Sequence, residues 1–342
     1  MASISKLGVF SVLALGGGLA LSAGIAAALL ATGETKRSST EGSQVAFRHD
    51  PNVLHIDIGG RPFADYVYGD KVITRPFFAH IKTPAGVQVT RNHPPDPDKD
   101  LTDHATFHPG LWMTFGDVSG NDYWRLKAKV EHEMFVAAPE GGPGPGTFTV
   151  RNYYRSGDGA DRVAAEVASY TISVEPDGYL LLWESTFTPY GDTPQIVFGD
   201  QEEMGLGIRV QTKLAEQFGG EITDSEGRKG AKQIWSKQAD WIDYSGTLEG
   251  KWIGMTIMPD PANFRPSWYH ARDYGLIVAN PFGQEAMKAG PKSAVAVKKG
   301  DELRLRYGVL IHSSDAKTGI DLKQAYRRFL DKVGSKPSAR AR

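Results

Sequence analysis

The chain contains no cysteine among its 342 residues. Disulfide bonds, thiolate metal sites, a cysteine nucleophile and a lipid-modified cysteine anchor are therefore excluded. A surplus of positive charge is also lacking, because 39 Lys and Arg residues stand against 40 Asp and Glu residues and the formal net charge is -1. Nothing in this balance would neutralise the phosphates of a nucleic acid, so we expect no nucleic-acid partner.

Several catalytic signatures are missing as well. We find no serine-nucleophile elbow, no Walker loop, no EF-hand loop and no GxGxxG followed by a helix. These absences argue against acyl transfer, nucleotide hydrolysis and EF-type calcium binding. We therefore expect no cofactor.

Long uncharged stretches are absent except at the N-terminus, where no charged residue lies between Leu7 and Gly33. A membrane-spanning helix needs about 20 apolar residues, whereas the apolar core of a secretory signal has roughly 7–15. The length favours a membrane anchor over residues 1–33, although Ala26–Ala28 would also suit a signal cleavage site. A single span before a large globular part usually exports that part. We expect a single-pass inner-membrane protein with its body on the periplasmic side, or a secreted protein if the segment is cleaved.

Small residues repeat every four positions in this segment. Gly16, Ala20, Gly24 and Ala28 would lie on one face of a helix, where they would let a second helix approach closely. An Ala- and Gly-rich segment also produces such a stripe by chance. If the face is used, the helix packs into a larger integral membrane protein complex.

The body is predicted to be a single all-β domain over residues 49–334. A polar flexible tether over 34–48 precedes it and a short disordered tail over 335–342 follows. Residues 170–174 alternate in polarity, Pro176-Asp177-Gly178 forms a turn, and residues 179–183 return, which predicts a β-hairpin. Residues 303–311 alternate in the same way and predict a half-buried strand.

Other short apolar stretches predict further strands, at 111–116, 146–154, 195–199, 251–258 and 274–279. The loops 93–100 and 139–146 are too rich in Pro and Gly for regular structure. One convincing helix in the body is expected near Asp321–Val333, where apolar residues follow the helical period. Many short strands and one late helix indicate a large antiparallel β-sandwich with one C-terminal helix.

The segment Asp103–Trp124 is the densest in titratable and aromatic side chains. His104 and His108 have the spacing that places two zinc ligands on one helix face, but Pro109-Gly110 follows at once and argues against a helix. A metal would also need a third ligand such as Asp103, His80 or Glu203, and no known ligand spacing is present. We predict no metal site. Proton transfer or ligand binding by these histidines, beside Trp112, and a structural role under the loop remain open.

Two further clusters combine charge with glycine or aromatic residues. In residues 199–209, Glu203 would act as a general acid or base if it were desolvated beside Arg209, and a solvated acidic turn is the alternative. In residues 266–283, an extended chain places Trp268, His270 and Arg272 on one face, with Asn280 beyond them. Aromatic rings and charged hydrogen-bonding groups together suit a sugar, and an ordinary strand end is the alternative.

These three clusters resemble a bacterial family labelled "methane oxygenase PmoA". The similar stretches are DHATFHPGLWMTFGDVSGNDYWR (103–125), EEMGLGIRV (202–210) and WYHARDYGLIVANPFG (268–283). The resemblance covers residues 54–312 and implies an all-β sandwich similar to the galactose-mutarotase-like supersandwich. The label does not describe this chain, since a methane monooxygenase membrane subunit has several spanning helices and this chain has one hydrophobic segment.

Two functional hypotheses follow from the sequence. The first is a tethered or exported β-sandwich that binds, or also acts on, a carbohydrate-like ligand. Its site would consist of four proton-transfer residues and five binding residues, namely His104, His108, Glu203 and His270, with Trp112, Arg209, Trp268, Arg272 and Asn280. The second is a non-catalytic accessory subunit whose N-terminal helix docks in a membrane complex. The sequence leaves open whether the protein is an enzyme.

Overall fold

A computed structural model describes residues 44–337 of the chain. The expected membrane anchor, the small-residue stripe of Gly16, Ala20, Gly24 and Ala28, and most of the tail lie outside these residues. Within 44–337 we find no helix with the length and apolar character needed to cross a membrane.

The first of two large sheets, called sheet 1, has eight strands in the order β1-β2-β3-β4-β5-β11-β16-β15. All neighbouring strands are antiparallel. Strands β5 and β11 are far apart in the sequence but are neighbours in this sheet. The bounds are β1 Val45–Asp50, β2 Val53–Ile58, β3 Arg61–Val67, β4 Phe77–Ala79, β5 Leu111–Phe115, β11 Met204–Arg209, β15 Trp268–Arg272 and β16 Leu276–Asn280.

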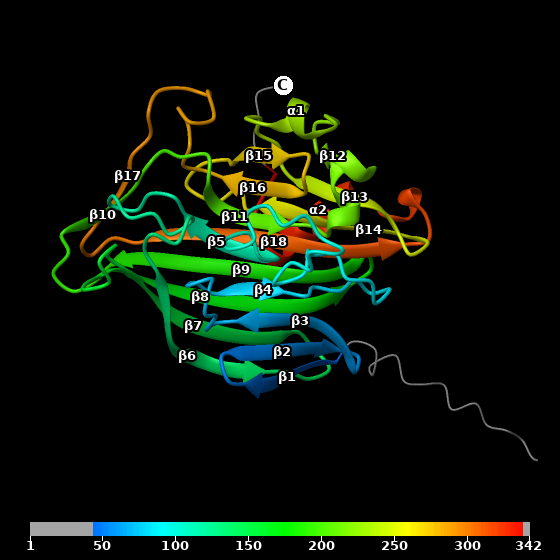
Figure 1. Cartoon of the computed structure of the whole chain (residues 1–342), viewed down its shortest axis with the longest axis horizontal. Helices are drawn as coiled ribbons and strands as arrows, with labels where there is room; N and C mark the ends of the chain where they lie inside the picture. The colour runs from blue at the N-terminus through cyan, green and yellow to red at the C-terminus, as the bar shows by residue number, and fades with distance from the viewer. Residues whose placement is uncertain (1–43, 338–342) are drawn as a thin grey trace, which may run out of the picture. The chain divides into compact units, whose positions relative to one another are not determined.

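The second large sheet, called sheet 2, also has eight antiparallel strands, in the order β12-β13-β14-β18-β9-β8-β7-β6. Figure 1 shows the strands of the two sheets lying over one another. The bounds are β6 Val130–Glu140, β7 Gly146–Arg155, β8 Arg162–Glu175, β9 Gly178–Pro189, β12 Glu221–Asp224, β13 Ile242–Leu248, β14 Lys251–Pro259 and β18 Leu303–Ser314.

Smaller elements complete the described chain. Strands β10 Gln195–Phe198 and β17 Val295–Lys298 form a two-stranded sheet of their own. The helical elements are the 3₁₀ turns η2 Thr212–Leu214, η3 Glu216–Phe218 and η4 Lys317–Gly319, and the helices α1 Ala231–Ile234 and α2 Leu322–Val333. The all-β sandwich with one long C-terminal helix is therefore confirmed.

Alternating polarity explains the longest strands. In the β8–β9 hairpin, residues 162–175 pair with residues 178–189 around the predicted turn, and Tyr170 lies opposite Trp183. Their inward side chains are buried, as the period of two requires. The predicted hairpin and the predicted strand at β18 are both confirmed.

The main core fills the space between the two sheets and is rich in aromatic rings. Phe78 of sheet 1 contacts Tyr170 and Trp183 of sheet 2, with ring centroids 5.2 and 5.7 Å apart. Phe115 meets Phe187 across the same interface at 5.3 Å. Edge-to-face packing of this kind stabilises a sandwich beyond the burial of apolar area alone.

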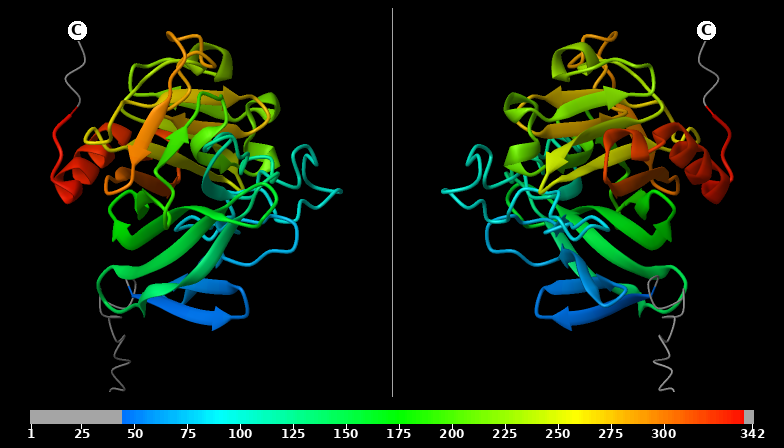
Figure 2. Two further views of the ribbon diagram at one scale, coloured as in Figure 1. Left: turned by 90° about the vertical axis from the view of Figure 1, so that its left-hand side faces the viewer. Right: turned by 90° about the vertical axis from the view of Figure 1, so that its right-hand side faces the viewer.

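Each sheet is also covered on its outer side. Helix α2 begins after Asp321, whose side chain accepts a hydrogen bond from the Gln324 amide, and packs Phe329 and Leu330 onto sheet 2. On sheet 1 the cover is made of loops, which pack around Trp112 and Trp124 in a separate apolar cluster. In both views of Figure 2 the red α2 and the cyan loops lie on opposite sides. The site described below lies under these loops.

Some boundaries differ from the sequence predictions. The tether expected over 34–48 is wrong at its end, because β1 starts at Val45, which is buried against the core. The loop expected over 139–146 is shorter, since β6 continues to Glu140 and β7 begins at Gly146. In both cases cross-strand hydrogen bonds and burial outweigh the local Pro, Gly and polar composition.

The Phe78 ring tests the packing between the sheets. We expect Phe78→Ala to lower the free energy of unfolding by about 3–5 kcal/mol, because the cavity it leaves lies between two rigid sheets. Urea denaturation followed by circular dichroism measures the change. Phe218→Ala is the matched control, since this ring is 56% exposed. Equal urea midpoints for the two variants would contradict the role of Phe78.

Candidate functional site

Buried arginine side chains hold the loop 100–110 on the outer face of sheet 1. Arg91 donates from Nη1 to the carbonyl oxygens of Leu101 (2.8 Å) and Asp103 (2.7 Å), and from Nη2 to that of His108 (2.8 Å). Arg75 donates in the same way to the carbonyl oxygens of Tyr123, Trp124 and Phe107. Without regular pairing, these carbonyls would be buried and unsatisfied. The arginines thus fix an irregular segment in place.

Both guanidinium groups stay charged at neutral pH. Burial lowers the pKa of Arg75 to about 9 and that of Arg91 to about 10, still well above 7. Arg75 pairs with no carboxylate in the described part of the chain. Burying a charge without an ion-pair partner is costly. Its bonds to the loop carbonyls are what keep it there.

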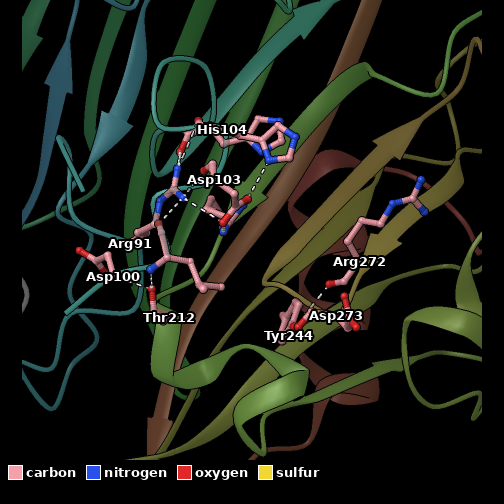
Figure 3. Close-up of polar contacts among 11 residues, drawn as sticks. Arg91, Asp100, Asp103, His104, Thr212, Tyr244, Arg272 and Asp273 are labelled. Carbon is pink, nitrogen blue, oxygen red and sulfur yellow. Dashed lines mark hydrogen bonds and ion pairs between the residues drawn. The ribbon is translucent and has the colours of Figure 1, made fainter. Parts of the chain in front are cut away.

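Asp103 is the carboxylate at the centre of this loop. Arg209, only 1% exposed, donates to both of its oxygens at 2.7 and 2.6 Å, which is bidentate pairing. His104 Nδ1 lies 2.7 Å from Asp103 Oδ2. Burial acts to raise the pKa of Asp103, but the hydrogen bonds from Arg209 and His104 outweigh it and lower the pKa to about 2. Asp103 is therefore ionised throughout the neutral range. Figure 3 shows its position beside His104 and Arg91.

His104 carries the accessible ring of the site, with a side chain that is 37% exposed. Its ring is stacked between those of His108 and Tyr274, at centroid distances of 4.6 and 5.5 Å. The bond to ionised Asp103 keeps a proton on Nδ1 and so leaves the Nε2 lone pair as an acceptor. The backbone has a φ of +50°, a conformation that costs energy for a residue with a side chain.

His108 lies beneath His104 and is almost fully buried. Its Nε2 accepts a hydrogen bond from Trp124 Nε1 at 3.2 Å, and its ring stacks on Trp112. Burial is the main cause that moves the pKa of His108 well below its usual value, and the positive charges of Arg209, Arg75 and Arg91 act in the same direction. A neutral His108 supports the stack. Trp112 fits there because residue 207 is glycine. The Cβ atom of any other residue at this position would lie 2.9 Å from the indole ring.

The structure does not bring Glu203 to the histidines. Glu203 precedes β11 and forms an ion pair with Arg125, whereas Arg209 ends the same strand. Six residues of extended chain separate these positions by about 20 Å. The single pocket that the sequence predicted, with Glu203 beside His104, is therefore wrong. The sequence could not show which end of the strand the loop 100–110 crosses.

His270 and Arg272 belong to a second polar group, on edge strand β15. The acid that meets them is Glu202, which lies 2.9 Å from Arg272 Nη2 and 3.4 Å from His270 Nδ1. Burial, followed by the charge of Arg272, lowers the pKa of His270 to about 3, so this ring is neutral. Trp268, His270 and Arg272 occupy every second position of β15, so they lie on one face of the strand, as predicted from an extended chain.

Asn280 has a local role at the end of β16. Its side-chain amide donates to the carbonyl oxygens of Gln201 and Glu202, and its Oδ1 accepts from the amides of Phe282 and Gly283. These four bonds use the side chain to join two turns. The ligand contact predicted for Asn280 has no support from this arrangement.

A cavity of about 530 Å³ adjoins Arg272 at the edge of sheet 1. The sequence pointed to only one of its lining residues, Arg272. The lining consists of Glu216, Gln217, Ala231, Lys232, Trp235, Ala271, Arg272 and Asp273. No sequence pattern points to Trp235, because it follows a four-residue helix in a polar segment.

A third polar group lies near β3, where Asp65 accepts from both His55 and His80 at 2.6 and 2.7 Å. The bond to Asp65 raises the pKa of His80. The sequence offers His80 as a possible metal ligand, but its Nδ1 contacts Asp65 and its Nε2 contacts the His93 carbonyl oxygen. Over residues 44–337, no group of three or more His, Asp or Glu side chains has a geometry that could hold a metal ion.

The fold and the site define a class of protein: a two-sheet antiparallel sandwich with a loop-covered polar site on the outside of one sheet. The chain belongs to the family of unknown function DUF6807, whose model matches residues 53–326. These residues include all three motifs singled out in the sequence. The resemblance to the PmoA-like family stays a prediction. A comparison with curated proteins finds no match.

A comparison with solved structures finds matches that share little sequence with this chain. The Slr1438 protein from Synechocystis sp. PCC 6803 is 10% identical, with 79% of this chain and 96% of that chain covered and a TM-score of 0.29. A galactose mutarotase related enzyme from Lactobacillus acidophilus is 9% identical, with 80% and 98% covered and a TM-score of 0.33. A beta-arabinopyranosidase is 9% identical, with 79% of this chain but 38% of that chain covered and a TM-score of 0.32.

Replacing the bidentate partner of Asp103 tests the electrostatics of the site. We expect Arg209→Lys to raise the pKa of Asp103 from about 2 toward the ordinary value of 3.8, because an ammonium group cannot donate two parallel hydrogen bonds. Carbon-13 NMR titration of the carboxyl group measures the change. Arg125→Lys, which alters the pair with Glu203, should leave Asp103 unaffected. An unchanged Asp103 in Arg209→Lys would show that the pair does not set its pKa.

The pH dependence of stability follows from the same pair. The folded-state pKa of Asp103, about 2, lies below the unfolded value of about 3.9, so ionised Asp103 stabilises the fold above pH 4. This contribution is lost as the pH falls through 2. We expect Asp103→Asn to be less stable than wild type at pH 7 and the difference to shrink between pH 4 and 2. Urea unfolding at a series of pH values measures it, and a constant difference would contradict the assignment.

Proposed function

We propose that the protein binds a carbohydrate or similar polyol on the outer face of sheet 1 and that His104 removes a proton from it. The observation that carries the proposal is the fixed Asp103–His104 pair, in which one ring nitrogen is held by a carboxylate and the other is left as an acceptor. A general base needs this arrangement: an accessible lone pair and a partner that stabilises the protonated ring.

The proton would pass from a substrate hydroxyl to Nε2 of His104. Asp103 then stabilises the imidazolium that forms, while it remains ionised because Arg209 holds its pKa low. Asp103 and Arg209 are thus positioning residues, and His104 is the residue that takes the proton. The loop is preorganised by Arg75 and Arg91, so little reorganisation is needed during the reaction.

The surrounding charge favours removal of a proton over its delivery. Arg75, Arg91 and Arg209 lie near the ring stacked on His104, and their positive charges contribute to the lowered pKa of His108. The same positive field would stabilise the negative charge that develops on a substrate oxygen as its proton leaves. A hydroxyl group becomes a better proton donor in such a field.

Polyols are the favoured class because of what lies next to the base. Tyr274 is half-buried, stacks on His104 and also lies 4.6 Å from the Arg209 guanidinium. An aromatic surface beside a hydrogen-bonding nitrogen matches the C–H faces and hydroxyl groups of a sugar. The proposal gives no role to Glu203 or His270, because neither side chain reaches this position.

Substitution of His104 tests the proposal. Proton NMR of a panel of reducing aldoses reports anomeric interconversion, which begins with loss of the anomeric hydroxyl proton. We expect wild-type protein to accelerate this interconversion and His104→Gln to reduce the acceleration by about 10²–10⁴-fold, the usual contribution of a general base.

His49→Gln is the matched control, since His49 is an exposed histidine on edge strand β1. This variant should behave as wild type. The proposal is wrong if wild-type protein accelerates the interconversion of no aldose in the panel, or if His104→Gln retains full activity.

A further inference from the structure

The cavity of about 530 Å³ beside β15 lies across the β15–β16 turn from His104. The turn places neighbouring residues toward different sites, because Asp273 lines the cavity while Tyr274 stacks on His104. Figure 3 shows Arg272 extending away from the Asp103 loop, with Asp273 and Tyr244 beside it. The cavity is therefore separate from the surface around His104, although the two share one turn.

Hydrogen bonds join the segments that line the cavity, namely η3, α1 and the end of β15, and so fix its form. The Tyr244 hydroxyl accepts from the Glu216 amide at 2.6 Å and donates to the Asp273 carbonyl oxygen at 3.1 Å, which joins η3 to the end of β15. Glu216 Oε2 accepts from the Ala231 amide at 2.9 Å, which joins η3 to α1. Residue 230 must be glycine, because it has a φ of +80° and a Cβ would lie 2.5 Å from Glu216 Oε1.

The lining combines one large aromatic ring with balanced charges. Trp235 supplies the indole, and its Nε1 is buried without a hydrogen-bond partner in the described part of the chain. Glu216 and Asp273 supply two negative charges, Lys232 and Arg272 two positive ones. The two carboxylates would repel an anionic ligand, and the two basic groups would repel a cationic one. An uncharged ligand with many hydroxyl groups can use both as hydrogen-bond partners.

The size of the cavity agrees with a small-molecule ligand. Ligand sites usually occupy about 300–1,000 Å³ and combine apolar surface with a few converging polar groups. We infer that this cavity binds an uncharged sugar, with one ring stacked on Trp235 and its hydroxyl groups bonded to Glu216, Gln217, Arg272 and Asp273. The inference rests on the proposed function for the choice of sugars as the ligand class, and it assigns them a second site.

Binding of methyl glycosides tests the inference without any reaction, because a methyl glycoside cannot interconvert between anomers. Isothermal titration calorimetry would compare neutral methyl glycosides with methyl glucuronide, an anion, and methyl glucosaminide, a cation. We expect a neutral glycoside to bind best and Trp235→Ala to weaken its binding about tenfold or more, because the stacking surface is lost. Trp235→Phe should lie between the two and also shows whether the segment still folds.

The controls separate this inference from the proposed function. Phe218→Ala removes an exposed ring from η3 that does not line the cavity, and it should bind as wild type. His104→Gln should also keep its affinity. Unchanged binding in folded Trp235→Ala, or preference for a charged glycoside, would overturn the cavity assignment while leaving the role of His104 standing. Binding that depends on Trp235, without proton transfer in wild-type protein, would overturn the role of His104 alone.

Discussion

The outer face of sheet 1 depends on how an irregular loop satisfies its carbonyl groups. The loop 100–110 lies on a sheet and has no strand partner, so its carbonyl oxygens need other donors. Arg91 donates to the carbonyl oxygens of Leu101, Asp103 and His108, and Arg75 donates to that of Phe107, at the cost of burying two charges. A water molecule would satisfy one such oxygen without fixing its direction. The guanidinium groups set the direction of each, and thereby the position of His104.

The sandwich provides the stiff base that this arrangement needs. Aromatic rings such as Phe78 and Phe115 link the two sheets, so the strands under the loop cannot shift independently. Arg209 and Trp112 rise from adjacent strands of that base into the loop. A functional group carried by a loop is then positioned almost as well as one carried by a strand.

The sequence predicted the fold class and the β8–β9 hairpin because alternating polarity reports which side of a strand is buried. It also predicted that His104, His108 and Arg209 belong to one site, from two separate motifs that are rich in charged and aromatic residues. Asp103 entered only as a possible third metal ligand, although it is the residue that joins His104 to Arg209. It failed for Glu203, because motif density does not reveal which end of a strand faces a loop. Glu202, one position earlier, reaches Arg272 instead. Trp235 was missed because its cavity is formed by segments that are distant in sequence and individually unremarkable in composition.

The β15–β16 turn of this protein leaves little room for a change in length. Only Asp273, Tyr274 and Gly275 separate the two strands, and Gly275 has a φ of +104°, which a residue with a side chain rarely adopts. Surface turns generally tolerate insertions. Here one added residue would rotate Tyr274 away from His104 or carry Asp273 out of the cavity wall. The turn therefore behaves as a spacer of fixed length, where a change in length, more than a change in residue type, would damage both sites together.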